Sequence, residues 1–178
     1  AEGGGWFSTT GDDPTVLLRI KEQYDGAEPA AGSVAVWNLL MLAHLLGGDE
    51  ARQHVDRVER TLRRVAQSAQ VARAAPMMMA GASTYISGVS QVIIVGARDA
   101  TAELHRALTA YFLPGVVSLV VEPGANQTAI AERIPWVGAM TMRDGMPTAY
   151  VCHDFACQEP VTAPERLRAQ LDALLAHR

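Results

Sequence analysis

The sequence predicts a mixed α/β fold in two parts, a helical region over residues 1–88 and a small α/β domain over residues 89–178. Helical periodicity dominates the first part, whereas a continuous β-branched run opens the second part. Beyond that run, strand patterns alternate with helix patterns. This order favours parallel pairing with right-handed crossovers, so we expect a mainly parallel sheet.

The helical region is predicted to contain an αα-hairpin. Residues 33–46 are apolar almost all round, which is typical of an inner helix of a larger helical assembly and predicts burial on several sides. Ser33 stands where a capping residue would, and Gly47-Gly48 ends the helix. Residues 49–71 carry one narrow apolar stripe among charges, which is typical of an outer, half-exposed helix.

The remaining elements follow from local patterns. A third helix should begin at Pro76, because proline is favoured in the first turn. In the second part, strands are predicted at residues 91–95, 116–121, 140–142 and 148–152, and helices at residues 99–112, 127–133 and 164–176.

Composition excludes several classes of function. Hydrophobic residues make up 49% of the chain, which is enough for a core, and the net charge of -4 argues against binding to nucleic-acid phosphates. No apolar run reaches about 18 residues, so neither a transmembrane helix nor a membrane partner is expected. The start does not resemble a signal peptide or a natural N-terminus. We therefore expect a missing N-terminal portion and a cytoplasmic location.

Three blocks of sequence point to a known family. Residues 15–46 read TVLLRIKEQYDGAEPAAGSVAVWNLLMLAHLL, residues 91–98 read QVIIVGAR and residues 148–164 read TAYVCHDFACQEPVTAP. In order and spacing they resemble the C-terminal part of the thioredoxin-domain-containing proteins of the spermatogenesis-associated type, whose activity is not settled. The resemblance implies a larger protein with a thioredoxin-like domain, an α/α toroid like that of N-acylglucosamine 2-epimerases and six-hairpin glycosidases, and a small α/β tail.

This chain would then hold the last toroid helices and the tail, and the missing thioredoxin-like and toroid portions would be its partners. It departs from the family where Ala30 and Gly32 replace polar residues, and where Ser8 stands in place of an acidic residue. These departures weaken the case for carbohydrate chemistry.

The predicted ligand-binding residues lie just before and along the first helix. In toroids, which this chain resembles, loops before inner helices rim the central pocket, and polar groups on such loops are plausible sites. The residues given this role are Arg19, Lys21, Tyr24, Asp25 and Glu28 in the loop, and Ser33, Trp37 and His44 on one face of the helix. The alternative readings are an ion-paired surface loop, a core tryptophan and a packed, hydrogen-bonded histidine.

Cys152 and Cys157 are separated by four residues, unlike the two of thioredoxin-type redox pairs. They could be two structural thiols, or a reversible disulfide if the segment turns back and brings the Cα atoms within about 7 Å. A metal site is disfavoured because Cys152 and His153, at the end of a strand, would point to opposite faces. We therefore give these cysteines a possible redox role and predict no metal site.

Two classes of function remain open. In one, the chain is part of an enzyme whose intact form binds or transforms a sugar-like molecule, with catalytic residues unknown. In the other, it is a non-catalytic structural or interaction module that docks the thioredoxin-like domain, with a redox-responsive cysteine pair. The chain alone is not expected to catalyse a reaction. No cofactor is predicted, since no nucleotide-binding glycine signature is present, and apolar helix faces favour self-association.

Overall fold

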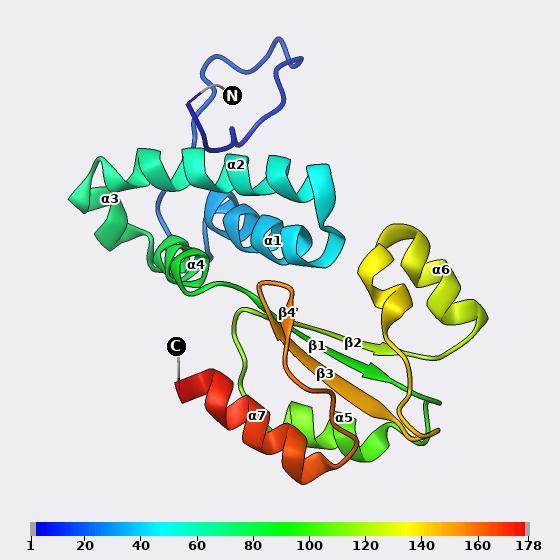
Figure 1. Cartoon of the computed structure of the whole chain (residues 1–178). Coiled ribbons are helices and arrows are strands. Elements are labelled where there is room, and N and C mark those ends of the chain that lie inside the picture. The colour runs from blue at the N-terminus through cyan, green and yellow to red at the C-terminus, as the bar shows by residue number, and fades with distance from the viewer. Residues whose placement is uncertain (1–2, 177–178) are drawn as a thin grey trace. The chain divides into compact units, whose positions relative to one another are not determined.

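The computed structural model describes residues 3–176 and contains two compact units (Figure 1). The first unit comprises the described residues up to Ala43 together with Gly48–Ile86. The second unit comprises His44–Gly47 and the described residues from Ser87 onwards. Helices dominate the first unit and a four-stranded sheet occupies the second, which confirms the mixed α/β fold class.

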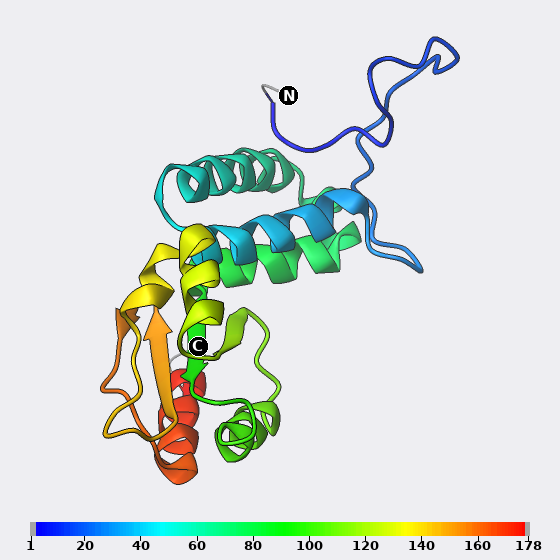
Figure 2. The same cartoon turned by 90° about the vertical axis from the view of Figure 1, so that its right-hand side faces the viewer.

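Four helices supply the regular structure of the first unit: α1 (Ala31–Leu46), α2 (Gly48–Ala66), α3 (Ala69–Ala74) and α4 (Pro76–Ser87), although the last residues of α1 and of α4 belong to the second unit. Figure 2 shows α1, α2 and α4 side by side. Val36 on α1, Val58 on α2 and Met78 on α4 are buried. Gly81 lets α4 approach α1 closely, because a Cβ at this position would lie 2.9 Å from Cγ1 of Val36.

Two helix boundaries differ from the sequence prediction. Ser33 does not cap α1; the carboxylate of Asp25 accepts a hydrogen bond from the Ala30 amide at 2.7 Å and performs that role. The helix predicted over residues 49–71 is divided, because Ser68 starts α3 and its hydroxyl oxygen accepts from the Val71 amide at 3.4 Å.

Within this chain the first helix is buried along one side, and its predicted burial on further sides, which requires neighbours from the missing toroid portion, stays a prediction. Its buried residues, Gly32, Ser33, Val36, Leu40 and Ala43, form one stripe. On another flank Val34 is 37% exposed and Leu42 is 39% exposed. The helix therefore keeps a partly exposed apolar flank within this chain.

The sheet of the second unit has the strand order β2-β1-β3-β4. Its strands are β1 (Ser90–Val95), β2 (Val116–Val121), β3 (Thr148–His153) and β4 (Ala156–Cys157). Only β1 and β2 pair in parallel; β3 pairs antiparallel with both β1 and β4. The prediction of a mainly parallel sheet is therefore wrong. Residues 140–142 form no strand either, and a turn closed by the Arg143–Met146 bridge leads into β3.

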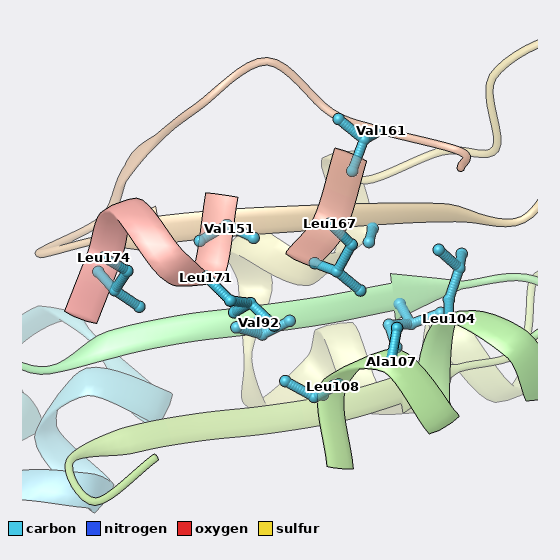
Figure 3. Close-up of a cluster of buried hydrophobic side chains, with 11 residues drawn as sticks. Val92, Leu104, Ala107, Leu108, Val151, Val161, Leu167, Leu171 and Leu174 are labelled. Carbon is cyan, nitrogen blue, oxygen red and sulfur yellow. The ribbon is translucent and has the colours of Figure 1, made fainter. Parts of the chain in front are cut away.

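Helices cover both faces of this sheet. On one face α5 (Ala102–Thr109) and α7 (Pro164–Ala176) pack on the side chains of Val92 and Ile94, and Figure 3 shows part of this apolar cluster. On the other face α6 (Ala125–Arg133) and the 3-10 helix η1 (Pro135–Ala139) pack on Ile93 and Val95. Successive residues of β1 point to opposite faces, so this central strand is completely buried.

Candidate functional site

A short hairpin formed by β3 and β4 carries both cysteines. Cys152 and Cys157 are partners in the antiparallel register, their Cα atoms are 3.8 Å apart and their sulfurs are bonded. The segment therefore turns back as the disulfide interpretation required, and the alternative of two separate thiols is wrong for this structure. The bond also occupies both thiolates that a metal site would have used.

The turn of the hairpin consists of Asp154 and Phe155, whose φ angles are 45° and 65°. Positive φ at both central residues is the signature of the tight hairpin turns that usually contain asparagine or glycine. A bulky aromatic residue rarely adopts this conformation, which costs on the order of 1–2 kcal/mol. Contacts elsewhere must therefore hold Phe155 in place.

Aromatic contacts within the second unit provide that support. The Phe155 ring stacks on the His44 imidazole with centroids 5.8 Å apart, and it meets the Trp136 ring edge-on at 5.9 Å. The indole N–H of Trp136 in turn donates to the Leu45 carbonyl oxygen at 2.9 Å. Aromatic ring pairs contribute about 0.5–1.5 kcal/mol each beyond area burial, so the two ring contacts of Phe155 offset the cost of the turn.

Polar side chains run beside the turn in a chain from Ser90 to His44. The Ser90 hydroxyl lies 3.0 Å from His153 Nδ1, His153 Nε2 lies 3.6 Å from Asp154 Oδ2, and Asp154 Oδ1 lies 3.2 Å from His44 Nε2. The order serine, histidine, carboxylate is that of a hydrolase. Ser90 is fully buried, however, and 3.6 Å exceeds a hydrogen bond between imidazole and carboxylate. These groups therefore tether the hairpin and offer no accessible nucleophile.

A cavity of about 350 Å³ lies beside the disulfide. Its lining is mainly apolar and aromatic: it includes Trp136, Met140, Tyr150 and Phe155 together with both cysteines. The volume is at the lower end of the roughly 300–1,000 Å³ found for small-molecule sites. All of its lining residues belong to the second unit.

Gln91 also lines this cavity, although its side chain is completely buried. Its Nε2 donates to the His44 carbonyl oxygen at 3.2 Å, but its Oε1 has no hydrogen-bond partner among residues 3–176. A buried acceptor without a partner costs about 1–3 kcal/mol, and few native side chains remain in that state. Gln91 is thus a residue of the cavity lining with one buried acceptor unpaired among residues 3–176.

The predicted ligand-binding loop of the first unit is built differently. Arg19 donates from Nη2 to the Thr9 carbonyl oxygen at 3.1 Å, and Lys21 donates from Nζ to the Gly4 carbonyl oxygen. Both cations also lie over the Phe7 ring, at 4.1 Å and 4.9 Å from its centroid. These two cations therefore bind residues that precede them in the same unit.

The other residues of that loop are either exposed or engaged. Tyr24 is 65% exposed and Glu28 is exposed. The Asp25 carboxylate accepts hydrogen bonds from the backbone amides of Ala30 at 2.7 Å, Met77 at 2.8 Å and Met78 at 3.3 Å. It therefore stabilises the N-termini of α1 and α4 together.

The electrostatics of Asp25 agree with this structural role. Burial raises the pKa of its carboxyl group, but hydrogen bonds from the backbone amides of Ala30, Met78 and Met77 outweigh that effect and hold the pKa below the ordinary value of 3.8. Asp25 is therefore ionised at neutral pH and is bound by helix N-termini of its own unit.

The predicted face of Ser33, Trp37 and His44 is divided between the units. Ser33 is completely buried and Trp37 is half-buried in the first unit, whereas His44 contacts the hairpin in the second. The ligand-binding role assigned to these residues and to the loop stays a prediction. The role of His44 beside Phe155 and Asp154 follows from contacts that its own segment does not reveal.

Sequence reasoning missed Gln91, Trp136 and Phe155 as parts of a site. One signal was available for Gln91, since it is a polar residue at the head of a run that otherwise reads as a buried strand. A buried polar side chain is more informative than an apolar one, because burial has to be compensated by a partner.

The fold and the site together define the class: a mixed α/β protein whose sheet-containing unit carries a disulfide-closed hairpin beside an apolar cavity. None of the helices between residues 3 and 176 is long and apolar enough to cross a membrane. No protein-family model matches the chain.

Individual relatives do match it. The chain is 30% identical over 178 residues to human Spermatogenesis-associated protein 20 and 29% identical over 179 residues to the rat protein of that name, with 96% of the chain covered in each case. An uncharacterised protein of Caenorhabditis elegans is 27% identical over 168 residues. The chain spans 22% of the length of these relatives. The predicted resemblance is thus confirmed, and the matches are consistent with a C-terminal part of that family.

Proposed function

We propose that this chain is a non-catalytic structural and interaction module of a larger protein, and that its hairpin responds to thiol redox conditions. The disulfide between Cys152 and Cys157 carries this proposal. Cys152 is 2% exposed, whereas Cys157 is exposed. The sulfur of Cys157 is therefore positioned for attack from solvent, and the sulfur of Cys152 is then the one that leaves.

The reaction is a thiol–disulfide exchange with a dithiol protein. A thiolate of the dithiol attacks the sulfur of Cys157, forms a mixed disulfide with it and releases Cys152 as a thiolate, which takes up a proton. The second thiol of the reductant then gives up its proton and attacks the reductant's first sulfur in the mixed disulfide. This step releases Cys157 as a thiolate, which takes up a proton. The hairpin cysteines are reduced and the dithiol is oxidised to a disulfide.

The expected reductant is a thioredoxin-like domain, which the family resemblance assigns to the N-terminal portion of the parent. A cytoplasmic location, also a prediction, would favour a reversible bond, because cytosolic disulfides in mesophiles are usually transient or redox-sensing. The docking role of the α/β unit and the redox role of its hairpin are then parts of one function.

Reduction should loosen the hairpin while the rest of the unit stays folded. β4 has only two residues, both exposed, and its register with β3 consists of the pairs Cys152–Cys157 and His153–Ala156. Beyond β4 the Gln158 amide donates to the Val151 carbonyl oxygen at 2.9 Å and Ala149 pairs with Val161, so the part of the hairpin that depends on the disulfide is its tip. Without the bond, the Asp154-Phe155 turn loses the covalent closure that holds its two strands together.

The sugar-binding alternative has less support from the first unit. Arg19, Lys21 and Asp25 already bind backbone groups there, so they are not free to meet a polar ligand without giving up those contacts. For the intact parent, with its expected toroid, sugar binding stays a prediction. A thermal-shift screen of that parent with sugars would test it separately.

The experiment for the redox role uses the 178-residue chain in defined ratios of reduced and oxidised dithiothreitol. Thiols are then alkylated and counted by mass, and hydrogen exchange is recorded in both states. We expect two thiols to appear together at a potential above about -300 mV, the range of exchangeable disulfides. Amides of residues 153–157 should exchange faster after reduction, whereas those of α5 and α7 should not change.

A thioredoxin with its reductase should accelerate the reduction, and a Cys152→Ser, Cys157→Ser double variant serves as the control. This variant should show the fast exchange at residues 153–157 under all conditions. A disulfide that stays oxidised far below -300 mV, or identical exchange in both states, would refute the redox role.

A further inference from the structure

The cavity beside the hairpin has a wall chemistry that selects for an uncharged, flat and largely apolar occupant. Among the described residues that line it, none carries a charge at neutral pH. Trp136, Tyr150 and Phe155 supply aromatic surface, and Met140 supplies an adaptable thioether. An ionised ligand would lose its hydration here without gaining a counter-charge.

The polar groups of the aromatic walls are already paired. The Trp136 N–H donates to the Leu45 carbonyl oxygen. The Tyr150 hydroxyl donates to the Thr141 carbonyl oxygen at 2.7 Å and accepts from the Thr141 amide at 3.0 Å. These rings therefore present apolar surface to the cavity and do not require a polar group from an occupant.

Gln91 is different because its amide is only half satisfied. Its orientation is fixed by Nε2, which donates to the His44 carbonyl oxygen; the flipped amide would set two acceptors against each other. Oε1 is consequently left buried without a partner among the described residues. An occupant that brings one donor would complete this hydrogen bond, and one that brings an acceptor would not.

We propose that this cavity binds an uncharged small molecule with a planar aromatic body and one N–H or O–H donor, which pairs with Gln91 Oε1. The volume supports this size class: a cavity of about 150 Å³ in another protein holds benzene, so about 350 Å³ accommodates two fused rings. The proposal does not depend on the redox role, since it concerns the protein with its disulfide intact.

Indole is the probe, and 1-methylindole is its matched control because it keeps the rings and lacks the donor. The oxidised 178-residue chain is titrated with each compound, and the Met140 methyl and Gln91 side-chain amide resonances are followed by NMR. We expect saturable shifts at both sites. Binding of 1-methylindole should be roughly 2- to 10-fold weaker, the loss of one hydrogen bond.

Two variants separate the donor contact from the cavity itself. Gln91→Met keeps the size of the side chain and removes the acceptor, so indole and 1-methylindole should bind it equally. Ala139→Trp places a large ring at an exposed lining position and should abolish binding of both compounds while the fold is kept. If Gln91→Met failed to fold, Ala139→Trp would still test whether this cavity is the site.

Three results would overturn the proposal: no saturable shift at Met140, equal affinity of the native chain for both compounds, or unchanged indole binding by Ala139→Trp. None of them bears on thiol exchange at Cys157, because all titrations use the oxidised protein. Conversely, a disulfide that proves inert would leave the binding result standing.

Discussion

The loop over residues 19–28 in the first unit and the hairpin cavity in the second differ in how their polar groups are used. The loop is the richer of the two in charge, yet Arg19, Lys21 and Asp25 all bind groups within their own unit. The cavity is almost entirely apolar, yet Gln91 Oε1 in its wall has no partner among residues 3–176. We therefore use the unmet hydrogen bond of Gln91, and not the density of polar residues, as the guide to a ligand.

The reason is the different cost of leaving a group unpaired. A half-exposed cation can turn to water when a protein partner is lost, so its contacts carry little information. A buried amide oxygen has no such substitute and costs about 1–3 kcal/mol when unpaired. Substitutions at Asp25, at the two cysteines and at Gln91, together with acid, test this contrast.

The largest effect is expected for Asp25→Ala, which leaves three backbone amides at two helix N-termini without their acceptor. Each lost cap costs about 0.5–2 kcal/mol, so urea unfolding should show a loss of about 1–4 kcal/mol. Hydrogen exchange should quicken first in the initial turns of α1 and α4. The matched control Glu28→Ala, on an exposed side chain, should stay within about 0.5 kcal/mol. Equal losses in both variants would contradict the capping role.

Acid should remove the same stabilisation. Because the folded-state pKa of Asp25 lies below its ordinary value of 3.8, the contribution is complete above that pH and is lost as the pH falls through the lower folded-state pKa. Asp25→Asn keeps the shape without the charge. The stability difference between wild type and Asp25→Asn, measured by urea unfolding from about pH 6 to about pH 2, should shrink below pH 3.8. A constant difference would show that Asp25 has no depressed pKa.

Removal of the disulfide should have an intermediate effect on the second unit. Cys152→Ala combined with Cys157→Ala opens a loop with a sequence separation of 5, and closure of so short a loop is worth about 2 kcal/mol. The loss should appear in unfolding without reductant and vanish when the wild type is reduced. Exchange at the N-termini of α1 and α4 should not change, and a change there would mean that the two regions are not independent.

Gln91→Met should have the smallest effect on stability. It loses the hydrogen bond to the His44 carbonyl oxygen but also removes the unpaired Oε1, so the two terms should cancel to within about 1 kcal/mol. Ile93→Val on the same face of β1 is the control and should cost about 0.5–1.5 kcal/mol. A penalty of several kcal/mol for Gln91→Met alone would indicate that Oε1 has a partner in the unliganded protein.

Local periodicity was sufficient to predict most elements of the fold. β1 and β2 follow from β-branched runs, and α7 follows from the pattern of residues 164–176. The direction of β3 was not predictable in the same way, because a strand pattern does not specify whether its neighbour runs parallel or antiparallel. The Asp154-Phe155 turn lacks the usual asparagine or glycine, so the hairpin gave no local signal.

The candidate site was less predictable because it depends on distant residues. Gln91 is oriented by the carbonyl of His44, which is 47 positions away. Phe155 is held between the rings of His44, 111 positions earlier in the chain, and Trp136. The cysteine pair was visible in the sequence. Whether the two thiols are bonded depended on the Asp154-Phe155 turn, which the sequence did not reveal. Short-range patterns therefore located the strand and the cysteines without showing the cavity between them.

The side chains of β1 point alternately into the two buried layers on either side of the sheet, and this limits which sequence changes the protein can accept. A single inserted residue before Ser90 that shifted the strand by one position would turn the Gln91 amide into the dry layer under α5 and α7, and Ser90 would take its place beside the disulfide. We therefore expect a change in length directly ahead of the strand to be poorly tolerated. New binding preferences in this lineage should arise by substitution at the cavity wall, with the spacing of the central strand kept.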